Sequence, residues 1–518
     1  MSEAPLPHRE VLRVLSGVLL GMFLAALDQT IVTTALPTMA AELSGVEHLS
    51  WVIAIYLLTS TASTPIYGKL SDLYGRRILL QTAISIFIGG SLLCAAAQDM
   101  TQLIGARAIQ GIGGGGLITL AHALIADHVS PRERGRYQGY LSGMWATASV
   151  SGPLLGGLFV DYLSWRWVFG VNLPIGIIAF ILCRHALRHL ANRYEERTID
   201  YLGAALLTSA VAALLLVTTW GGSQYAWISA PIVILAFAGI VLMALFAVQE
   251  LNASEPILPP RLFRNDVFRV ANGVSFVVSM VLFGSTMMLP IFLQLVIGVS
   301  AARSGIAVAP LTGGTVFGTL IAGQLMRRTG RYRRFPLIGL PIAGLGLLAF
   351  ATMSPATPLP LAAAYMLVTS TGIGLSLPVM LVAVQNAAEP RDIGAATSAV
   401  NFFRSMGGSF GASILWSILI IALNRDLASA GVAGAGETSI QFLEGGPDAL
   451  ARLSPALRAA VLPALVGGFH AVFIASAVLA FAAAGITLLL KELPLRTSAA
   501  SPAAAAPARD PAAPKSPD

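Results

Sequence analysis

Long apolar runs separated by short polar connectors make up most of the 518-residue chain. Each run holds roughly 20 residues, the number an α-helix needs to cross a hydrocarbon core at about 1.5 Å per residue. The pattern predicts fourteen membrane-spanning helices. Their expected ranges are 14–36, 48–67, 78–98, 102–126, 137–160, 166–187, 201–220, 228–249, 270–297, 304–326, 335–353, 360–385, 394–422 and 466–490.

Basic residues lie almost entirely on one side of these predicted helices. If the N-terminus is cytoplasmic, 25 of the 32 Lys and Arg fall in cytoplasmic segments and five in external ones, while Arg107 and Arg404 lie within helices. This distribution obeys the positive-inside rule, which the reverse topology would violate. Both termini are therefore expected in the cytoplasm.

Composition agrees with lipid as the main solvent of the chain. Hydrophobic residues make up 56% and charged residues 11%, whereas soluble domains carry about 25% charged residues. The formal charge of +7 does not indicate a nucleic-acid partner, because the charges are scattered over connectors instead of forming one basic face. Cys94 and Cys183 both lie in apolar runs, which favours buried thiols over a disulfide or a metal site.

Two short sequence motifs occur twice. Residues 68–77 read GKLSDLYGRR, and residues 323–331 read GQLMRRTGR, which is the same frame displaced by 255 positions. Residues 131–135 (PRERG) return at 390–394 (PRDIG), displaced by 259. Two matches at nearly the same displacement predict parallel repeats of six helices, an arrangement known among secondary transporters.

The repeat leaves the seventh and eighth helices unpaired, so the expected arrangement is six helices, two inserted helices and six more. We expect the inserted pair to make few functional contacts, because no charge occurs between Asp200 and Glu250. The predicted organisation is a cytoplasmic N-terminus (1–13), a first bundle (14–190), inserted helices with linkers (191–265), a second bundle (266–493) with a long external loop (about 424–465), and a disordered cytoplasmic tail (494–518).

Five blocks of the sequence resemble the major facilitator superfamily, in particular its fourteen-helix drug:proton antiporter branch. They are 27–37 (LDQTIVTTALP), the 68–77 loop, 103–111 (LIGARAIQG), a helix-5 block with Gly139, Gly152, Pro153 and Gly156, and 165–174, which runs from WRW to NLP. Ala148 stands where the helix-5 block usually has glycine, and we expect close packing to survive this change.

The resemblance implies an all-α major facilitator fold and a proton-driven exporter that is not an enzyme and needs no cofactor. The expected partners are the bilayer, a small-molecule substrate and protons, with a periplasmic adaptor as a candidate partner in a Gram-negative cell. The implied location is the bacterial cytoplasmic (inner) membrane, with multiple passes.

Asp28 and Arg107 are the candidate proton-coupling residues. Asp28 lies about 14 residues, or roughly 21 Å, into the first predicted helix, and Arg107 lies in the outer part of the fourth. A charge at this depth costs at least about 2.5–3.5 kcal/mol and usually faces a cavity or a partner. A carboxylate that alternates between a proton and an arginine would couple transport to protons, whereas a fixed ion pair would be purely structural.

The 68–77 loop is expected to act as a conformational latch, a role that the resemblance implies. Its candidate residues are Gly68, Asp72, Gly75, Arg76 and Arg77. The alternative is that its basic residues only follow the positive-inside rule. The downstream copy has Arg327 at the position of Asp72, so the latch is expected to be asymmetric between the halves.

Small residues in the fifth helix predict close helix packing, and this is compatible with a flexible seam between the bundles. Polar and aromatic residues at membrane depth are candidates for a substrate cavity, with helix–helix contacts as the alternative. They are Gln29, Tyr56, Gln110, Trp145, Gln294, Asn401 and Arg404. His122 and His470 are expected at the interfaces, with a proton relay as the alternative.

Two nucleotide motifs are excluded. Gly111–Gly116 fits G-x-G-x-x-G, but it lies inside an apolar helix and does not follow a strand, as a dinucleotide site requires. No G-x-x-x-x-G-K-[ST] occurs, which argues against ATP as the direct energy source.

The favoured function is efflux of lipophilic drugs or toxic metabolites. The alternative is dedicated export of one natural product, siderophore or lipid, and the third candidate is a non-transporting receptor or scaffold.

Overall fold

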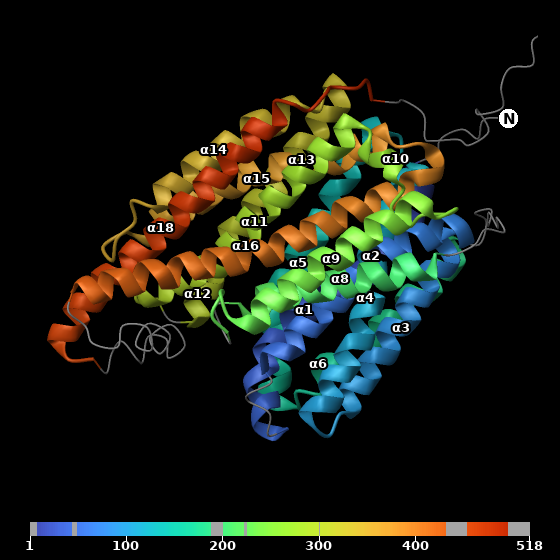
Figure 1. Cartoon of the computed structure of the whole chain (residues 1–518). Coiled ribbons are helices and arrows are strands. Elements are labelled where there is room, and N and C mark those ends of the chain that lie inside the picture. Colours follow the sequence, from blue (N-terminus) through green and yellow to red (C-terminus); the bar gives the residue numbers. More distant parts are fainter. Residues whose placement is uncertain are drawn as a thin grey trace, which may run out of the picture.

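The computed structural model describes residues 8–43, 49–187, 200–221, 225–299, 301–430 and 453–495. Within these ranges the chain is helical, with only one isolated β-bridge, between Gly221 and Tyr225. Figure 1 shows the helices arranged in two groups, the N-terminal one blue to teal and the C-terminal one yellow to red. The predictions for residues 1–7, the linker at 191–199, the centre of the long loop and most of the tail lie outside the described residues.

The N-terminal half is built from seven helical segments. They are α1 (His8–Glu42), α2 (Leu49–Tyr74), α3 (Arg76–Ala96), α4 (Met100–His128), α5 (Pro131–Tyr162), α6 (Trp167–Gly170) and α7 (Asn172–Ala186). The short α6 and α7 together fill the range predicted as one helix. Gly75 separates α2 from α3 with a φ of 87°, a conformation that a residue with a Cβ rarely adopts.

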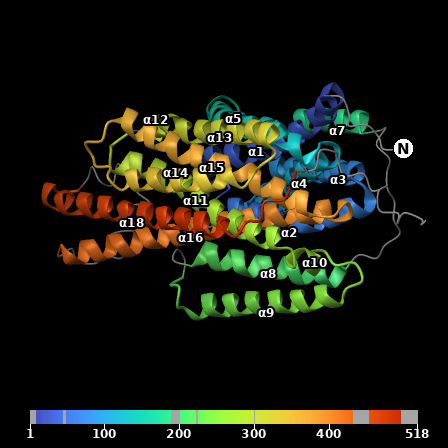
Figure 2. The same ribbon diagram turned by 90° about the horizontal axis from the view of Figure 1, so that it is seen from above.

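A helical hairpin follows the N-terminal half. It consists of α8 (Tyr201–Trp220) and α9 (Ala230–Asn252), which pack against each other, and the one-turn α10 (Pro260–Phe263) comes next. Figure 2 shows the hairpin at the edge of the molecule, with α8 toward the bundles and α9 outside it. It reaches the rest of the protein mainly through α2 and α16.

The C-terminal half completes the fold. Its segments are α11 (Asp266–Leu295), α12 (Ala301–Ala307), α13 (Ala309–Thr329), α14 (Arg334–Phe350), α15 (Leu359–Ala387), η2 (Pro390–Asp392), α16 (Ile393–Ser429) and α18 (Pro455–Thr487). Two helices extend past the predicted ends of the long loop. α16 continues through the polar residues Asn424, Arg425 and Asp426, and α18 begins at Pro455, eleven residues before its predicted start at 466, where Ser454 caps its N-terminus.

Twelve helices within the described ranges are long and apolar enough to cross a membrane. The other two predicted spans correspond to α2, which is 26 residues long but carries many polar residues, and to α14, an apolar helix of only 17 residues. The chain is therefore a multi-pass helical membrane protein.

Equivalent helices of the two halves pack in the same way. In α5, a Cβ added at Gly152 would lie 2.0 Å from the Thr30 hydroxyl of α1. In α16, a Cβ at Gly411, the residue 259 positions later, would lie 2.3 Å from the Cα of Met280 in α11. Close helix contact at both places shows that the sequence repeat corresponds to a structural one.

Candidate functional site

Asp28 lies completely buried inside the N-terminal half, where α1, α3, α4 and α7 meet. Its Oδ2 accepts a hydrogen bond from Arg107 Nη1 at 2.5 Å, and its Oδ1 accepts from Gln110 Nε2 at 2.8 Å and from Asn172 Nδ2 at 3.3 Å. Ser91 Oγ joins the network by accepting from the same two amides. Both carboxylate oxygens are thus satisfied, as a buried charge requires.

Arg107 is held as tightly as its partner. Its Nε donates to the carbonyl of Val52 at 3.1 Å, and Nη1 also donates to Gln110 Oε1 at 2.6 Å. The guanidinium stacks 4.2 Å from the centre of the Tyr56 ring, and the Phe169 ring lies 5.9 Å away. Cation–π contacts of this kind strengthen when water is excluded.

Glycines in α4 allow this network to form. A Cβ at Gly111 would lie 2.5 Å from the carbonyl oxygen of Tyr56, and one at Gly113 would lie 2.6 Å from the amide nitrogen of Phe87. The glycine run therefore lets α2 and α3 approach α4 on two sides. The G-x-G-x-x-G match excluded above has this packing role.

Asn172 and Ser91 are partners of Asp28 that sequence reasoning did not assign. Asn172 stands at the start of α7, in one of the five blocks that resemble the major facilitator superfamily. Its polar amide beside a long apolar run could have marked it as a buried hydrogen-bonding residue. Ser91 gave no signal, since single serines are common in membrane helices.

The latch residues lie at the contact between the two halves. Asp72 accepts hydrogen bonds from the backbone amides of Gly394 (3.1 Å) and Ala395 (3.0 Å), at the N-terminus of α16. A carboxylate at this position is stabilised by free amides and by the helix dipole. Arg76 pairs with Asp72 at 2.6 Å and with Asp127 at 2.8 Å, which anchors the carboxylate. The structure brings together Gly68, Asp72 and Arg76, while Arg77 stands in the first turn of α3.

The repeated motifs meet each other across the halves. A Cβ at Gly68 would lie 2.8 Å from the carbonyl oxygen of Gly394, and one at Gly323 would lie 2.1 Å from that of Gly135. Gly323 is the repeat equivalent of Gly68, and Gly394 is that of Gly135, so two related contacts close this end of the molecule. Figure 1 shows α16 crossing beside α2 at this end.

The two contacts differ in charge, as the sequence predicts. At the equivalent contact, where Arg327 stands at the repeat position of Asp72, Arg132 Nε of α5 donates to the carbonyl of Arg327 at 2.8 Å, at the end of α13. Among the described residues a carboxylate thus caps a helix at one contact, and an arginine bonds to a helix C-terminus at the other.

The helix-5 residues serve two different contacts. Gly152 and Gly156 face Thr30 and Thr34 of α1, whereas a Cβ at Gly139 would lie 2.3 Å from the side chain of Leu320 in α13. Pro153 is exposed on the surface of α5. The Thr30 hydroxyl donates to the carbonyl of Ala148 at 3.0 Å, so the alanine in place of glycine keeps the close approach.

The candidate cavity residues do not form one group. Tyr56 and Gln110 belong to the buried Asp28–Arg107 network, and Gln29 is partly buried next to it in α1. Trp145 packs beside Asp28's neighbours Ala26 and Leu27. A substrate role for these four residues stays a prediction.

The remaining candidates lie in the C-terminal half. Gln294 donates to Ser304 Oγ at 2.8 Å, and Asn401 is buried in α16. Arg404, also in α16, is partly buried within electrostatic range of His122 on α4. The ring of His122 contacts the carbonyl of Ile118.

His470 lies apart from these residues. Its Nε2 is 2.7 Å from the carbonyl oxygen of Met353. Like that of His122, its relay role stays a prediction.

The fold and this site define a class of protein: a helical membrane protein of two bundles, with a buried ion pair in one bundle and a capped helix N-terminus at the contact between the bundles. The chain belongs to the Major Facilitator Superfamily, whose family model matches residues 18–198 and 197–412.

Relatives of the chain are named as transporters. It is 39% identical to an uncharacterised MFS-type transporter of Mycobacterium tuberculosis, covering 93% of this chain and 70% of the relative. It is 34% identical to the multidrug transporter protein MdtP of Bacillus subtilis, covering 93% of each. The fold is similar to that of the human organic anion transporter MFSD10, with a TM-score of 0.62 at 15% identity over 94% of this chain and 100% of the other.

Removing the charge of Asp72 is expected to slow transport more than it weakens substrate binding. Asp72→Asn keeps the side-chain shape but loses the charge that stabilises the N-terminus of α16, so it changes the balance between conformations. Substrate affinity and turnover should be measured separately on the purified protein. A loss of affinity at normal turnover would contradict the latch role.

Proposed function

We propose that the protein is a proton-coupled secondary transporter that exports small lipophilic compounds by alternating access. The observation that carries the proposal is the Asp28–Arg107 pair, a carboxylate and an arginine that are both completely buried in the N-terminal half and bonded to each other. A carboxylate that is paired in one conformation and hydrated in another takes up and releases a proton once per cycle. The relatives named as multidrug transporters support lipophilic compounds as the substrates.

The geometry supports a two-state cycle. In this structure Asp28 is fully paired and the seam around Gly68 and Gly323 is closed. Opening that seam moves α16 away from α2 and α13 away from α5, while the bundles themselves remain packed. Substrate binding between the halves and protonation of Asp28 would then favour different states.

We further propose fourteen spans with α8 and α9 inserted between two six-helix bundles, and both termini in the cytoplasm. The charge asymmetry of the connectors supports this topology, and α2 and α14 supply the two spans beyond the twelve apolar helices. The closed seam then faces the cytoplasm. The cytoplasmic membrane of a bacterium is the location we propose.

Proteoliposomes provide the direct test of coupling. Substrate added to vesicles containing the purified protein should move protons in the opposite direction, measured with a pH-sensitive dye. Substrate binding without proton movement would favour the third class, a receptor or scaffold, over a transporter.

Export of one dedicated natural product is the second candidate function. Relatives at 33–36% identity include the efflux pump LUC4 of Fusarium and a transporter of the acurin A biosynthesis cluster of Aspergillus aculeatus. Expression in a pump-deleted host separates the candidates. Resistance to many unrelated compounds supports broad efflux, and resistance to one compound supports dedicated export.

Neutral or singly charged lipophiles are expected to be better substrates than dications. Asp28 is the carboxylate that the sequence places well inside a predicted helix, and Arg107 pairs with it in this structure, while Arg404 adds positive charge. A dication needs more than one buried negative charge to offset its desolvation, since each unpaired charge costs several kcal/mol. Overexpression should protect clearly against monovalent compounds and weakly against bis-cationic antiseptics, and equal protection would refute the single-carboxylate picture.

A further inference from the structure

An apolar cavity of about 570 Å³ lies outside the contact between the two halves, at the side of the C-terminal half. The hairpin helices α8 and α9 form one wall, and α11 and α16 form the other. Ligand pockets for drug-sized molecules measure roughly 300–1,000 Å³ and are lined by apolar and aromatic side chains with a few polar groups. The size of this cavity falls within that range.

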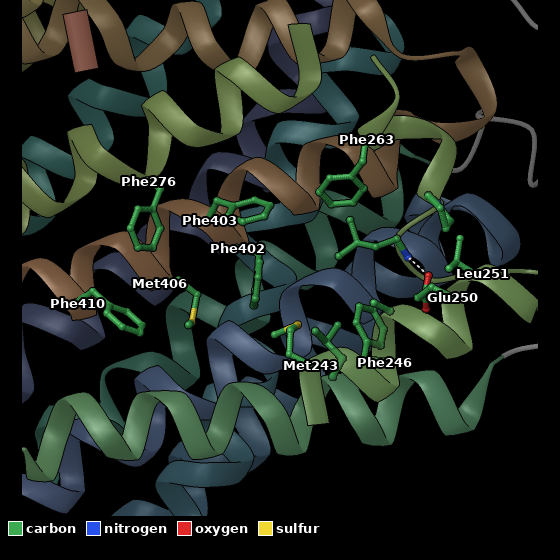
Figure 3. Close-up of a pocket in the computed structure, with 14 residues that line it drawn as sticks. Met243, Phe246, Glu250, Leu251, Phe263, Phe276, Phe402, Phe403, Met406 and Phe410 are labelled. Atoms are coloured by element: carbon green, nitrogen blue, oxygen red, sulfur yellow. Dashed lines mark hydrogen bonds between the residues drawn. The ribbon is translucent and has the colours of Figure 1, made fainter. Parts of the chain in front are cut away.

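Aromatic rings dominate the lining. Figure 3 shows Phe276 above, Phe402 and Phe403 in the middle, and Met243 and Phe246 below, with the rings gathered around a common space. The complete lining is Leu207, Met243, Phe246, Ala247, Glu250, Leu251, Leu258, Pro260, Phe263, Phe276, Phe402, Phe403, Met406 and Phe410. Ala247 and Leu251 of α9 line the cavity and are exposed, so the rim of the cavity opens to the surroundings of this apolar helix.

Glu250 is the one charged residue in the lining. It is buried at one end of the cavity, and its carboxylate accepts hydrogen bonds from the backbone amides of Ile257 (3.1 Å) and Leu258 (2.8 Å). These bonds fix the carboxylate in place. Lys69, whose ammonium pairs with Glu255, and the Asp200 carboxylate both lie within electrostatic range of Glu250 and act on it with opposite sign. The cavity therefore combines an apolar aromatic body with a negative end.

The wall formed by α16 separates this cavity from the interior. At about 100° per residue, Phe402, Met406 and Phe410 fall within roughly 80° of one another around the helix. Asn401 and Arg404 lie roughly on the opposite face, toward α4. One helix thus presents an apolar face to the cavity and a polar face to the N-terminal half.

The negative end of the cavity is connected to the latch. Glu255, in the connector after α9, pairs with Lys69 of the 68–77 loop at 2.7 Å. Arg261 of α10 makes two hydrogen bonds, at 3.0 and 2.8 Å, to Asp392, which precedes α16, and these bonds raise the pKa of the Arg261 guanidinium. Opening of the latch would therefore also shift the walls of the cavity.

We propose that this cavity is a membrane-facing binding site for a lipophilic monocation, which enters from the bilayer before it reaches the transport path. The proposal rests on the proposed export function, because it identifies where an exported compound is first bound. The rings accept the apolar body and favour a positive charge through cation–π contacts. Glu250 supplies the counter-charge.

The same charge disfavours an anionic phospholipid as the occupant. An anionic headgroup at the Glu250 end would meet a buried like charge, which is repulsive. The site also changes the expectation that the inserted helices make few functional contacts, because Leu207 and Met243 of the hairpin line it.

Photolabelling of the full-length protein in nanodiscs tests the site. The probe is a triphenylphosphonium cation that carries a benzophenone, with tetraphenylphosphonium as the unlabelled competitor and mass spectrometry to locate the crosslinks. We expect competed crosslinks on α9 and α16 around Ala247 and Met406. Ala247→Trp should fill the cavity and lower labelling at least fivefold, whereas Ala244→Trp, at an exposed alanine of the same helix outside the lining, should leave it unchanged.

Glu250→Gln is the second variant, and it preserves the shape of the side chain if the tryptophan variant fails to fold. It should weaken labelling by the cation about tenfold and leave labelling by a neutral benzophenone of similar size unchanged. Equal loss for both probes, or equal effects of the two tryptophan variants, overturns the proposal. Competition by phosphatidylglycerol but not by tetraphenylphosphonium also overturns it, in favour of a lipid.

Failure of the site and failure of the transport function give different results. Wild-type protein that exports tetraphenylphosphonium but is labelled only around Asp28 overturns the site and leaves the function. Wild-type protein that is labelled at α9 and α16 but drives no efflux supports the site and overturns the function.

Discussion

Asp28→Asn is expected to reduce proton-driven efflux to the level of empty vesicles while the protein still folds and inserts. The amide keeps one oxygen that can accept from Arg107, while its NH2 group replaces the oxygen that accepts from Gln110 and Asn172, and the amide cannot carry a proton through the cycle. Downhill movement of substrate should persist, since the halves can still rock. Efflux against a concentration gradient and proton movement should be measured in the same vesicles.

Loss of folding must be separated from loss of coupling. Removing one partner of a buried ion pair costs about 3–5 kcal/mol, because the other charge stays buried and unpaired. Asp28→Asn therefore leaves Arg107 with a stability cost, which its bonds to Val52 and Gln110 offset only in part.

A double variant provides the control. Asp28→Asn combined with Arg107→Gln removes both charges, so we expect its melting temperature to recover toward that of the wild type. Uphill transport should remain absent. If the double variant pumps, or if Asp28→Asn pumps at the wild-type rate, the pair is structural and the proton is carried elsewhere.

Gly323→Val is expected to prevent closure of the seam between α13 and α5, and so to stop the transport cycle. An added Cβ would lie 2.1 Å from the Gly135 carbonyl oxygen and 2.4 Å from its carbonyl carbon. Both are backbone atoms, which cannot rotate away as a flexible side chain can. Overpacking costs roughly 1–3 kcal/mol, which is about a 5- to 150-fold shift away from the closed state.

Gly313→Val is the matched control on the same helix, because a Cβ there meets nothing within 4 Å. Spin labels on the ends of α5 and α13 should report longer distances for Gly323→Val and wild-type distances for Gly313→Val. Transport should fall at least tenfold in the first and stay normal in the second. Normal transport by Gly323→Val would show that this seam is not closed during the cycle.

The sequence by itself determined the helices, the repeat and the two buried charges. In lipid each backbone amide and carbonyl must form its hydrogen bond within its own helix. A membrane-spanning segment therefore appears in the sequence as one continuous apolar run. Asp28 and Arg107 stood out for the same reason, since a charge inside such a run is rare and costly. The displaced copies of 68–77 and 131–135 predicted two related halves, and the structure shows the equivalent contacts.

Only the tertiary structure decided which residues meet. Gly68 packs against Gly394, and Gly323 packs against Gly135, because the two halves face each other. The local sequence of either motif does not predict this pairing. Tyr56 and Gln110 were candidates for a substrate cavity, yet close packing around the α4 glycines places them in the Asp28 network. Ser91 and Asn172 complete that network from two other helices.

The cavity beside α9 illustrates the same limit most clearly. Its residues come from the inserted hairpin, α10, α11 and α16, segments up to about 200 positions apart in the chain. Each phenylalanine taken alone is an ordinary apolar residue of a membrane helix. A cavity exists only where the side chains of several helices leave space unfilled, and that depends on how the helices pack, which no single run of the sequence specifies.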